Sequence, residues 1–165
     1  MRRCTKCVML ETHEMLAFDK EGVCSVCRQI EHKQTIDWTA KEKELFEFLE
    51  PYRGKASYDC IIPFSGGKDS TFQTYVLVTK FKLKPLIVSF DHGFYRPTVL
   101  KNNERTVKKL GVDFLKFKSD WQTVKKLMKE SLIRKGDIMW HSHCGIYAYP
   151  MQIAVKFKIP LIIWG

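Results

Sequence analysis

The sequence lacks any long hydrophobic run. None of its 165 residues belongs to a stretch of the roughly 18 apolar residues that a helix needs to span a bilayer. The first ten residues, MRRCTKCVML, also lack the apolar centre of a signal peptide. Internal repeats and low-complexity tracts are absent as well. These absences exclude a membrane-spanning helix, and we expect a cytoplasmic protein without a membrane partner.

Acidic residues are scarce relative to basic ones. The chain carries 28 Lys and Arg against 18 Asp and Glu, a net charge of +10. The excess is concentrated in residues 80–135, with 15 basic and 5 acidic side chains, whereas residues 1–34 hold 6 and 5. Such an excess is typical of solvated helix faces, but it also attracts nucleic acid or an acidic small molecule. Charge alone does not distinguish these interpretations.

The chain divides into three segments by its residue patterns. Residues 1–34 are polar and punctuated by cysteines, which predicts a small independent unit. Residues 35–56 form a linker, in which apolar residues at helical spacing predict a helix over 37–50 that stops at Pro51. Residues 57–165 alternate between apolar runs and amphipathic stretches, the pattern of one modest α/β domain.

Strands and helices alternate in this last segment. The predicted strands cover 58–64, 85–90, 112–117 and 160–164, and the predicted helices cover 69–80, 98–110, 119–135 and 145–157. Gly111 fits a left-handed helix stop, and Ser119 with Gln122 fits a capping box. Strands separated by helices predict a doubly wound parallel sheet. Because the final run stops at Gly165 where a loop is expected, we also expect that the chain is truncated.

Two Cys-x-x-Cys pairs near the amino terminus are separated by 16 residues, namely Cys4, Cys7, Cys24 and Cys27. This spacing predicts a four-thiolate zinc site that folds a segment too small for its own core. Two disulfides are the alternative, but thiols stay reduced in the cytoplasm. His13 and His32 are substitute ligands that the four cysteines make unnecessary, and Cys60 reads as a small core residue.

The stretch SGGKDS, residues 65–70, lies between a predicted strand and a predicted helix. It has neither the four-residue spacer of a Walker A loop nor the three spaced glycines of a dinucleotide fingerprint. Gly66 and Gly67 let the backbone approach an anion at a helix amino terminus. The hydroxyls of Ser65 and Ser70 can donate hydrogen bonds to phosphate. We therefore predict a phosphate-binding loop.

Lys68 and Asp69 complete this loop with opposite charges. Lys68 neutralises phosphate charge, whereas the Asp69 carboxylate repels phosphate unless a cation such as Mg²⁺ lies between them. SGGKDS after a strand resembles the signature of the PP-loop ATP pyrophosphatases, which have an adenine-nucleotide alpha-hydrolase-like fold. The resemblance implies that the loop grips the β,γ-pyrophosphate of ATP, which is cleaved between its α and β phosphates to adenylate an oxygen.

The resemblance also assigns individual residues. It implies that Asp69 holds Mg²⁺ and that ATP is bound by Ser65, Gly66, Gly67, Lys68, Asp69, Ser70 and Asp91. Asp91 ends the second predicted strand, near the metal or the ribose. A turn formed by Asp-His-Gly is the alternative interpretation of that stretch.

A wider set of stretches resembles the N-acetyl sugar amidotransferases, whose members continue well beyond 165 residues. The stretches are the two Cys-x-x-Cys pairs, Ile36-Asp37-Trp38, Tyr58-Asp59-Cys60, the loop, Phe90-Asp91-His92, Trp140-His141-Ser142-His143-Cys144-Gly145-Ile146 and Pro160-Leu161-Ile162-Ile163-Trp164-Gly165. These enzymes serve bacterial surface-polysaccharide pathways, such as O-antigen and lipopolysaccharide biosynthesis, and nonulosonic acid pathways. The resemblance implies that ATP activates an acetamido group of an acidic nucleotide sugar and that ammonia converts it to an acetamidino group. It also implies a separate glutaminase subunit, because this chain shows no glutaminase nucleophile.

The segment 140–145 brings further candidates for chemistry. His141 and His143 are candidate catalytic residues, and Cys144 follows them directly. Because the helix that follows returns to the carboxyl edge of the sheet, we expect these side chains on the substrate side, as proton-transfer groups or ligands. A structural role at a helix start explains them equally well.

Two other functions fit parts of the sequence. A PP-loop enzyme acting on tRNA, such as a thiolase, would use residues 80–135 as an RNA face. Many such enzymes need a Cys-x-x-Cys where this chain has only Cys144, so we expect no nucleic-acid partner. A non-catalytic zinc-ribbon adaptor with a nucleotide-binding module would not need Lys68, Asp69 and Ser70 together.

Overall fold

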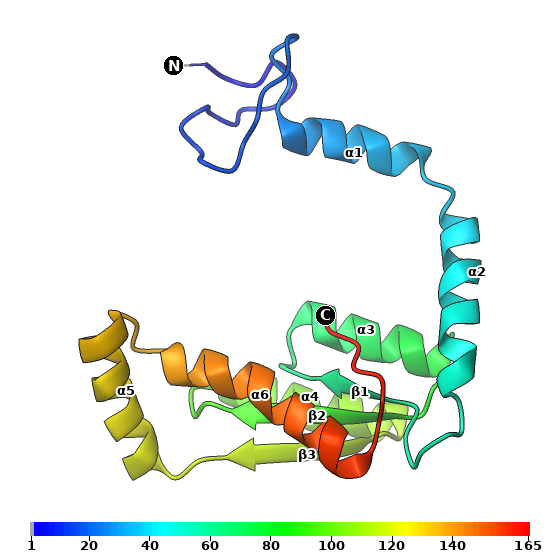
Figure 1. Cartoon of the computed structure of the whole chain (residues 1–165), viewed down its shortest axis with the longest axis vertical. Coiled ribbons are helices and arrows are strands. Elements are labelled where there is room, and N and C mark those ends of the chain that lie inside the picture. The colour runs from blue at the N-terminus through cyan, green and yellow to red at the C-terminus, as the bar shows by residue number, and fades with distance from the viewer. Residues whose placement is uncertain (1) are drawn as a thin grey trace. The chain divides into compact units, whose positions relative to one another are not determined.

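A computed structural model describes residues 2–165 of the chain. The chain forms two compact units, Met1–Leu45 and Phe46–Gly165. Figure 1 shows the elements along the chain. Among the described residues, no helix combines the length and the apolar character needed to cross a membrane.

The amino-terminal unit is built mainly from turns. Isolated antiparallel bridges join Arg3 to Leu10 and Phe18 to Cys24. Helix α1, Ser25–Thr35, begins directly after the second cysteine pair. The sequence pattern did not predict this helix. None of its residues is buried, so the helix does not need the apolar stripe by which an amphipathic helix is found in a sequence.

Helix α2, Trp38–Leu49, begins within the first unit and ends in the second. The Asp37 carboxylate caps it by accepting hydrogen bonds from the N–H groups of Thr39 and Ala40, both at 3.0 Å. A short 3-10 helix, Glu50–Tyr52, follows at Pro51. The helix predicted over 37–50 therefore forms with nearly the expected bounds.

The second unit contains a parallel sheet in the order β1-β2-β3, with β1 at Cys60–Pro63, β2 at Pro85–Asp91 and β3 at Asp113–Lys118. In the register, Ile61 lies opposite Leu86 and Leu86 lies opposite Asp113. The predicted α/β fold with a parallel sheet is therefore confirmed.

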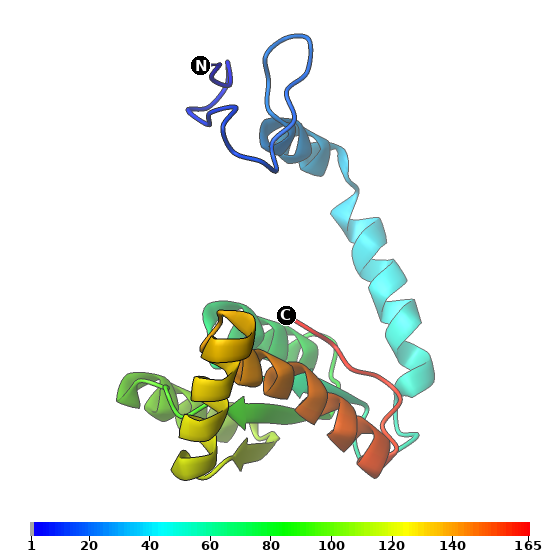
Figure 2. The ribbon, with the colours of Figure 1, turned by 60° about the vertical axis from the view of Figure 1, so that its left-hand side comes forward.

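The predicted fourth strand, 160–164, is reduced to a single parallel bridge between Ile61 and Ile162. Two backbone hydrogen bonds of 2.9 Å hold it there, from the Ile61 N–H to the Leu161 carbonyl and from the Ile163 N–H to the Ile61 carbonyl. The segment lies on the side of β1 away from β2, so the order of segments is 160–164, β1, β2, β3. Figure 2 shows it as an extended stretch after the last helix.

Four helices follow the strands: α3 at Lys68–Thr79, α4 at Pro97–Leu110, α5 at Trp121–Lys135, which packs against α6, and α6 at Trp140–Phe157. Gly111 ends α4 with a φ of 63°. The predicted capping box at Ser119 is wrong, since the Asp120 carboxylate caps α5 by accepting from the Thr123 N–H at 3.0 Å.

Helix α6 begins earlier than the predicted residue 145. Its first residue is Trp140, and the N–H of Met139 just before it donates to the Asp137 carboxylate at 2.8 Å. The segment 140–145 is thus the first turn and a half of a helix. Pro150 lies inside the same helix.

Helices cover both faces of the sheet. Alternate residues of β1 point to opposite faces and pack in different hydrophobic clusters. Ile62 packs in a cluster with Leu77 of α3, with Val107 of α4 against it. Ile61 packs in a second cluster with Ile153 of α6. In Figure 1, α6 passes in front of the sheet and α4 lies behind it. This doubly wound arrangement directs the loops after β1 and β2 to one edge, where such folds bind ligands.

Candidate functional site

The loop after β1 adopts a backbone that requires glycine. Gly66 has a φ of 77°, and a Cβ atom there would lie 1.8 Å from Oδ1 of Asn103, a buried residue of α4. Any larger residue would meet both backbone strain and a steric clash. Helix α4 therefore holds the loop closely against the start of α3.

The loop presents free donors at the amino terminus of α3. The first helical backbone bond runs from the Thr71 N–H to the Gly67 carbonyl at 3.1 Å, so the three preceding amides have no acceptor within the helix. The hydroxyls of Ser65 and Ser70 lie 3.2 Å apart beside them. Backbone amides, hydroxyls and the positive end of the helix dipole together suit an anion such as phosphate.

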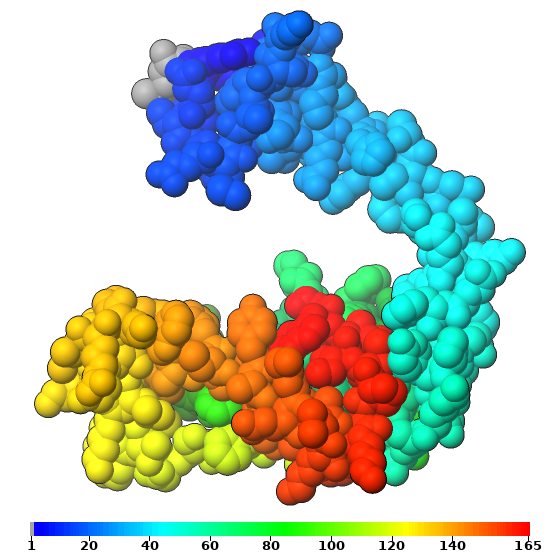
Figure 3. Space-filling view, in the orientation of Figure 1, coloured from blue at the N-terminus to red at the C-terminus, as the bar shows by residue number. Residues whose placement is uncertain are grey.

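These donors border a cavity of about 240 Å³. Polar groups from the loop and from the end of β2 line it, including Ser65, Asp69, Ser70, Ser89, His92 and Tyr95. Trp164 also lines it, as does α6 through Ile146 and Pro150. Figure 3 shows the carboxyl-terminal residues, in red, against α6, in orange, where the rings of Tyr147 and Trp164 are 5.2 Å apart.

The two charged residues of the loop lie on different sides of it. Asp69 borders the cavity, whereas Lys68 borders a hollow of about 600 Å³ between α3 and α4 that also contains Arg105 and Lys109. The Lys68 Nζ atom nevertheless donates to both Asp69 oxygens, at 2.7 and 2.9 Å. Both side chains are well exposed, by 89% and 72%, so this ion pair can exchange for a ligand at little free-energy cost.

Asp91 does not line the cavity, although the sequence placed it beside the nucleotide. Its side chain is buried, and its Oδ1 accepts from the Gly93 N–H at 2.8 Å. Its Oδ2 lies 3.5 Å from Nζ of Lys116. These contacts correspond to the turn-forming alternative, in which Asp91 shapes the bend after β2.

His92, which sequence reasoning left out, lines the cavity in its place. The Phe94 N–H donates to Nδ1 of His92 at 3.1 Å, and the ring lies 4.4 Å from that of Tyr95. Burial lowers the pKa of His92 below its ordinary value, and His141 lowers it further against the opposing effect of Asp91. His92 could have been identified from the sequence by its position next to Asp91, at the end of the second predicted strand.

The candidates of the segment 140–145 do not gather at one point. His141 is partly buried, with Nε2 3.1 Å from the Ser142 hydroxyl and a buried Nδ1 that has no hydrogen-bond partner within residues 2–165. His143 points elsewhere, with Nδ1 3.7 Å from the Asp137 carboxylate and 61% of its side chain exposed. Cys144 is exposed. Residues two apart on a helix face different directions, which separates the two histidines.

Gly145 allows α6 to pass close to the end of β2. A Cβ atom at this position would lie 2.4 Å from the ring of Phe90. That ring stacks on Phe117 at 5.7 Å, and Phe117 contacts Tyr149 of α6 at 5.4 Å. This aromatic layer fixes α6 against the strands beside the cavity.

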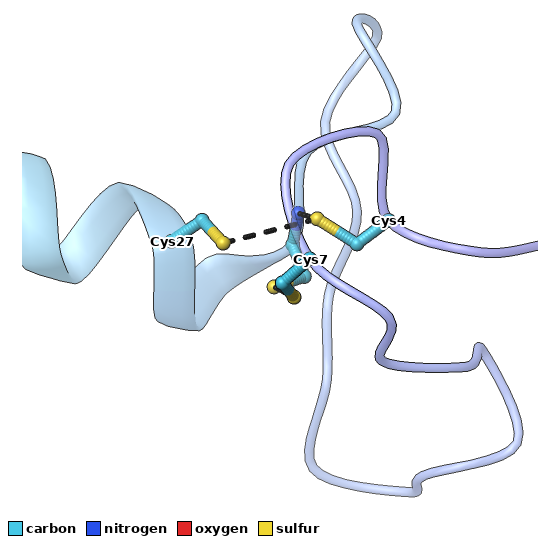
Figure 4. Close-up of side chains that lie close together, drawn as sticks. Cys4, Cys7 and Cys27 are labelled. Atoms are coloured by element: carbon cyan, nitrogen blue, oxygen red, sulfur yellow. Dashed lines mark hydrogen bonds between the residues drawn. The ribbon is translucent and has the colours of Figure 1, made fainter.

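The second candidate site is the cysteine cluster of the amino-terminal unit. The four sulfur atoms all lie within 4.8 Å of one another, and Figure 4 shows the side chains of Cys4, Cys7 and Cys27 converging. Cys4 and Cys27 are separated by 3.9 Å between sulfurs, and Cys7 and Cys24 by 3.7 Å. A tetrahedral zinc ion with Zn–S bonds of about 2.3 Å places its sulfurs about 3.8 Å apart, so these residues fit one zinc ion.

Backbone donors prepare this cluster for negative charge. The N–H groups of Cys24 and Lys6 point at Sγ of Cys4, at 3.2 and 3.4 Å. Although burial opposes it, these bonds lower the pKa of Cys4 to about 6. The pKa of Cys27 rises to about 12, because its thiol shares a hydrogen bond with Cys7 and is partly buried. Adjacent thiols that compete for one negative charge can all ionise when a metal cation binds them.

Charged side chains tie the segments of this unit together. Arg28 of α1 forms ion pairs with three carboxylates, those of Asp19, Glu21 and Glu31. Lys6, between the first two cysteines, also pairs with Glu31. The guanidinium thereby links the loop before the second cysteine pair to the helix after it.

Comparison with known proteins gives a distant relative. No protein-family model matches the sequence. An uncharacterized protein of Methanocaldococcus jannaschii is 28% identical over 138 residues, which cover 82% of this chain and 48% of the relative. The chain therefore spans about half the length of the curated relative that it matches.

Three solved structures resemble the chain in part. An NH3-dependent NAD synthetase from Campylobacter jejuni has a TM-score of 0.49 and 11% identity over 74% of this chain and 54% of its own. The U34-tRNA thiolase NcsA from Methanococcus maripaludis, solved with its 4Fe-4S cluster, has a TM-score of 0.47 and 14% identity over 100% and 54%. A predicted subunit of tRNA methyltransferase from Methanocaldococcus jannaschii has a TM-score of 0.33 and 29% identity over 46% and 37%. At such TM-scores, the fold assignment rests on the strand order and register of the chain itself.

Proposed function

We propose that residues 46–165 form an ATP-binding site of the PP-loop ATP pyrophosphatase class, which splits ATP into AMP and pyrophosphate. One observation carries this proposal: the loop Ser65–Ser70 directs the free amides of α3 and two hydroxyls into a cavity at the carboxyl edge of a parallel sheet. A cavity of about 240 Å³ lies just below the range of roughly 300–1,000 Å³ that is typical of ligand pockets. It suits the phosphate chain, with the base extending beyond it.

In this proposal the loop holds the β,γ-pyrophosphate. The amides at the start of α3 and the hydroxyls of Ser65 and Ser70 donate to its oxygens, and Lys68 exchanges its pair with Asp69 for the phosphate. Asp69 borders the cavity and is the residue suited to hold Mg²⁺ there. The metal would supply neutralisation of charge on the leaving pyrophosphate.

The reaction that we propose is the amidation of an N-acetyl group on an acidic nucleotide sugar. The amide oxygen attacks the α-phosphorus of ATP, and the bond between the α and β phosphates breaks, which releases pyrophosphate and gives an imidoyl adenylate. Ammonia then attacks the imidoyl carbon. AMP leaves and carries the former amide oxygen with it, and one proton is released from the added nitrogen. The acetamido group becomes an acetamidino group. Catalysis rests on positioning and charge neutralisation by the loop.

The partners follow from this chemistry. Ammonia would come from a separate glutaminase subunit. The acidic substrate suits the basic surface of the unit, since the hollow beside the loop carries Lys68, Arg105 and Lys109. The four cysteines would hold a structural zinc ion. A 4Fe-4S cluster needs its cysteines around four separate irons, whereas sulfurs 3.7 and 3.9 Å apart suit a single ion.

The test is an assay of the full chain with ATP, Mg²⁺, an ammonium salt and a set of acidic nucleotide sugars. We expect AMP and pyrophosphate to form only when a suitable sugar is present, and the sugar to lose about one mass unit as oxygen is exchanged for NH. Lys68→Ala should abolish both signals. Lys156→Ala, an equal loss of charge on an exposed turn of α6, should leave them unchanged.

A tRNA-modifying enzyme of the same class is the alternative function. A parallel reaction with bulk tRNA in place of the sugars distinguishes the two, because each enzyme releases AMP only with its own acceptor. Release of AMP with tRNA and with none of the sugars would overturn the amidotransferase proposal and retain the ATP-splitting site. Absence of AMP in both reactions, with the zinc content intact, would overturn the ATP-splitting site as well.

A further inference from the structure

His92 occupies the wall of the loop cavity and belongs to the element next to the loop. Strand β2 ends at Asp91, so His92 is the first residue beyond it. Its ring borders the same cavity as Ser65 and Ser70. Because β1 and β2 are parallel neighbours, the loop and His92 approach the cavity from adjacent strand ends.

The backbone fixes the proton on the His92 ring. The Phe94 N–H donates to Nδ1 at 3.1 Å, which requires a lone pair on that nitrogen. The neutral ring then carries its proton on Nε2, the outer nitrogen. The rings of Tyr95 and Phe94, at 4.4 and 5.9 Å, hold the imidazole in this orientation. Nε2 itself has no protein partner within residues 2–165.

Burial favours the neutral form of this ring and so lowers the pKa of His92. The neighbouring Asp91 carboxylate opposes this shift, although it is also engaged by the Gly93 N–H and by Lys116. The electrostatic effect of His141 lowers the pKa of His92 further. The Tyr95 ring packs against the imidazole at a tilt of 35°.

We propose that His92 contacts the nucleotide and donates a hydrogen bond from Nε2 to a phosphate oxygen, without acting as a base. This inference rests on the proposed ATP-binding function of the loop. The loop supplies donors on one side of the phosphate chain, and His92 supplies one from the end of β2. Action as a base at Nε2 would require the proton on Nδ1, where it would face the Phe94 N–H as a second donor.

Three substitutions separate a hydrogen-bond donor from a packing residue and from a base. His92→Phe keeps a ring against Tyr95 and Phe94 but has no donor, and His92→Gln keeps a donor near the position of Nε2. His143→Phe is the matched control, since His143 is exposed and does not border the cavity. Binding is measured by calorimetry with Mg²⁺ and α,β-methylene-ATP, whose methylene group prevents cleavage between the α and β phosphates.

We expect His92→Phe to bind the analogue about tenfold to a hundredfold more weakly, the range for one hydrogen bond to a charged group. His92→Gln should recover most of this loss, and His143→Phe should bind as the wild type does. The rate of AMP formation by His92→Gln should also fall at low pH in the same way as the wild-type rate. A base at this position would instead make His92→Gln inactive at every pH.

The outcomes separate this inference from the proposed function. If the wild-type protein fails to bind the analogue, the ATP site itself is wrong, and the inference falls with it. If the wild type binds and His92→Phe binds equally well, the donor role alone is overturned. If His92→Phe does not fold, as judged by its thermal transition, His92→Gln decides: binding and a pH profile like those of the wild type support the donor, and loss of both overturns it.

Discussion

The two units of this chain are stabilised by different means. Among the described residues of the amino-terminal unit, the buried apolar ones are Cys4, Val23 and Cys24, and two of these three are candidate metal ligands. The second unit buries two clusters, one on each face of its sheet, built on residues such as Ile61 and Ile62. A segment of about 40 residues cannot bury enough surface to be stable without a metal or disulfides, whereas a unit of about 120 can.

This difference relates stability to function in each unit. The cysteine unit uses its polar and charged groups to hold itself together, as Arg28 and its three carboxylates illustrate. The sheet unit obtains its stability from apolar packing, which leaves the polar loop Ser65–Ser70 free to bind a ligand.

Removal of the metal should give the largest effect and should act on one unit only. Structural zinc contributes about 10–16 kcal/mol in small zinc-binding peptides, so a chelator should unfold the cysteine unit. In amide hydrogen exchange, residues 2–45 should lose their protection and residues 46–165 should keep theirs. The metal content, measured by mass spectrometry, should be one zinc per chain before treatment.

Cysteine variants provide the matched control for this experiment. Cys24→Ser removes a buried candidate ligand and should abolish zinc binding, whereas Cys144→Ser changes an exposed thiol outside the cluster and should not. Protection of residues 2–45 that survives in the metal-free protein would show that the unit does not depend on a metal.

A cavity in the sheet unit should give the next largest effect. Ile62 of β1 is completely buried against α3, and Ile62→Ala should lower the free energy of unfolding by about 2–5 kcal/mol. Val155→Ala, at a side chain that is 79% exposed, should change it by less than about 0.5 kcal/mol. Urea unfolding monitored through the sheet unit measures both. Equal effects of the two variants would contradict the two-cluster core.

The sequence predicted the sheet unit well because its pattern reflects burial. The apolar runs at 58–64 and 85–90 contain β1 and β2, which helices cover on both faces, so their sequences are nearly continuously apolar. The run at 112–117 forms β3, which is largely exposed and contains charged residues. The run at 160–164 has a similar composition but joins β1 through one bridge. Composition therefore indicates that a segment is apolar and does not determine how far it pairs.

The site was predictable only where local sequence determines geometry. The loop Ser65–Ser70 and the four cysteines depend on spacing within a few residues, and the structure places the loop at a cavity and brings the four sulfurs together. The neighbourhood of the loop depends on tertiary contacts. The turn that Asp91 makes with Gly93 decides that His92 and not Asp91 borders the cavity. Neither His141 nor His143 borders it, although α6 begins at Trp140.

Gly66→Ala should test the close contact between α4 and the loop. At a φ of 77° an alanine costs about 1–2 kcal/mol in backbone strain, and its Cβ also meets Asn103. Gly54→Ala is the matched control, with a φ of 64° and no atom within 4 Å of the added Cβ. We expect a lower melting temperature for both variants, a larger decrease for Gly66→Ala, and loss of AMP formation for Gly66→Ala alone.

A second substitution separates the steric part of this effect from the backbone strain. In the double variant Gly66→Ala/Asn103→Ala the clash is relieved, so the effects of the two changes should not add. The double variant should recover part of the stability that the single variant lost. Additive losses would show that Asn103 does not restrict the loop.

The smallest expected effect is the loss of the α5 cap, and it depends on pH. Hydrogen bonds from Thr123 hold the pKa of Asp120 below its ordinary value, so the folded state favours the carboxylate. The stabilisation is therefore complete above the unfolded pKa of about 3.9 and is lost as the pH falls through the lower folded pKa. Asp120→Ala should melt slightly below the wild type at pH 7, and the difference should shrink as the pH falls below 4.

Asp120→Asn, a neutral residue that also caps helices, should melt close to the wild type without this pH dependence. A difference between Asp120→Ala and the wild type that stays constant down to pH 3 would contradict a cap that depends on the ionised carboxylate.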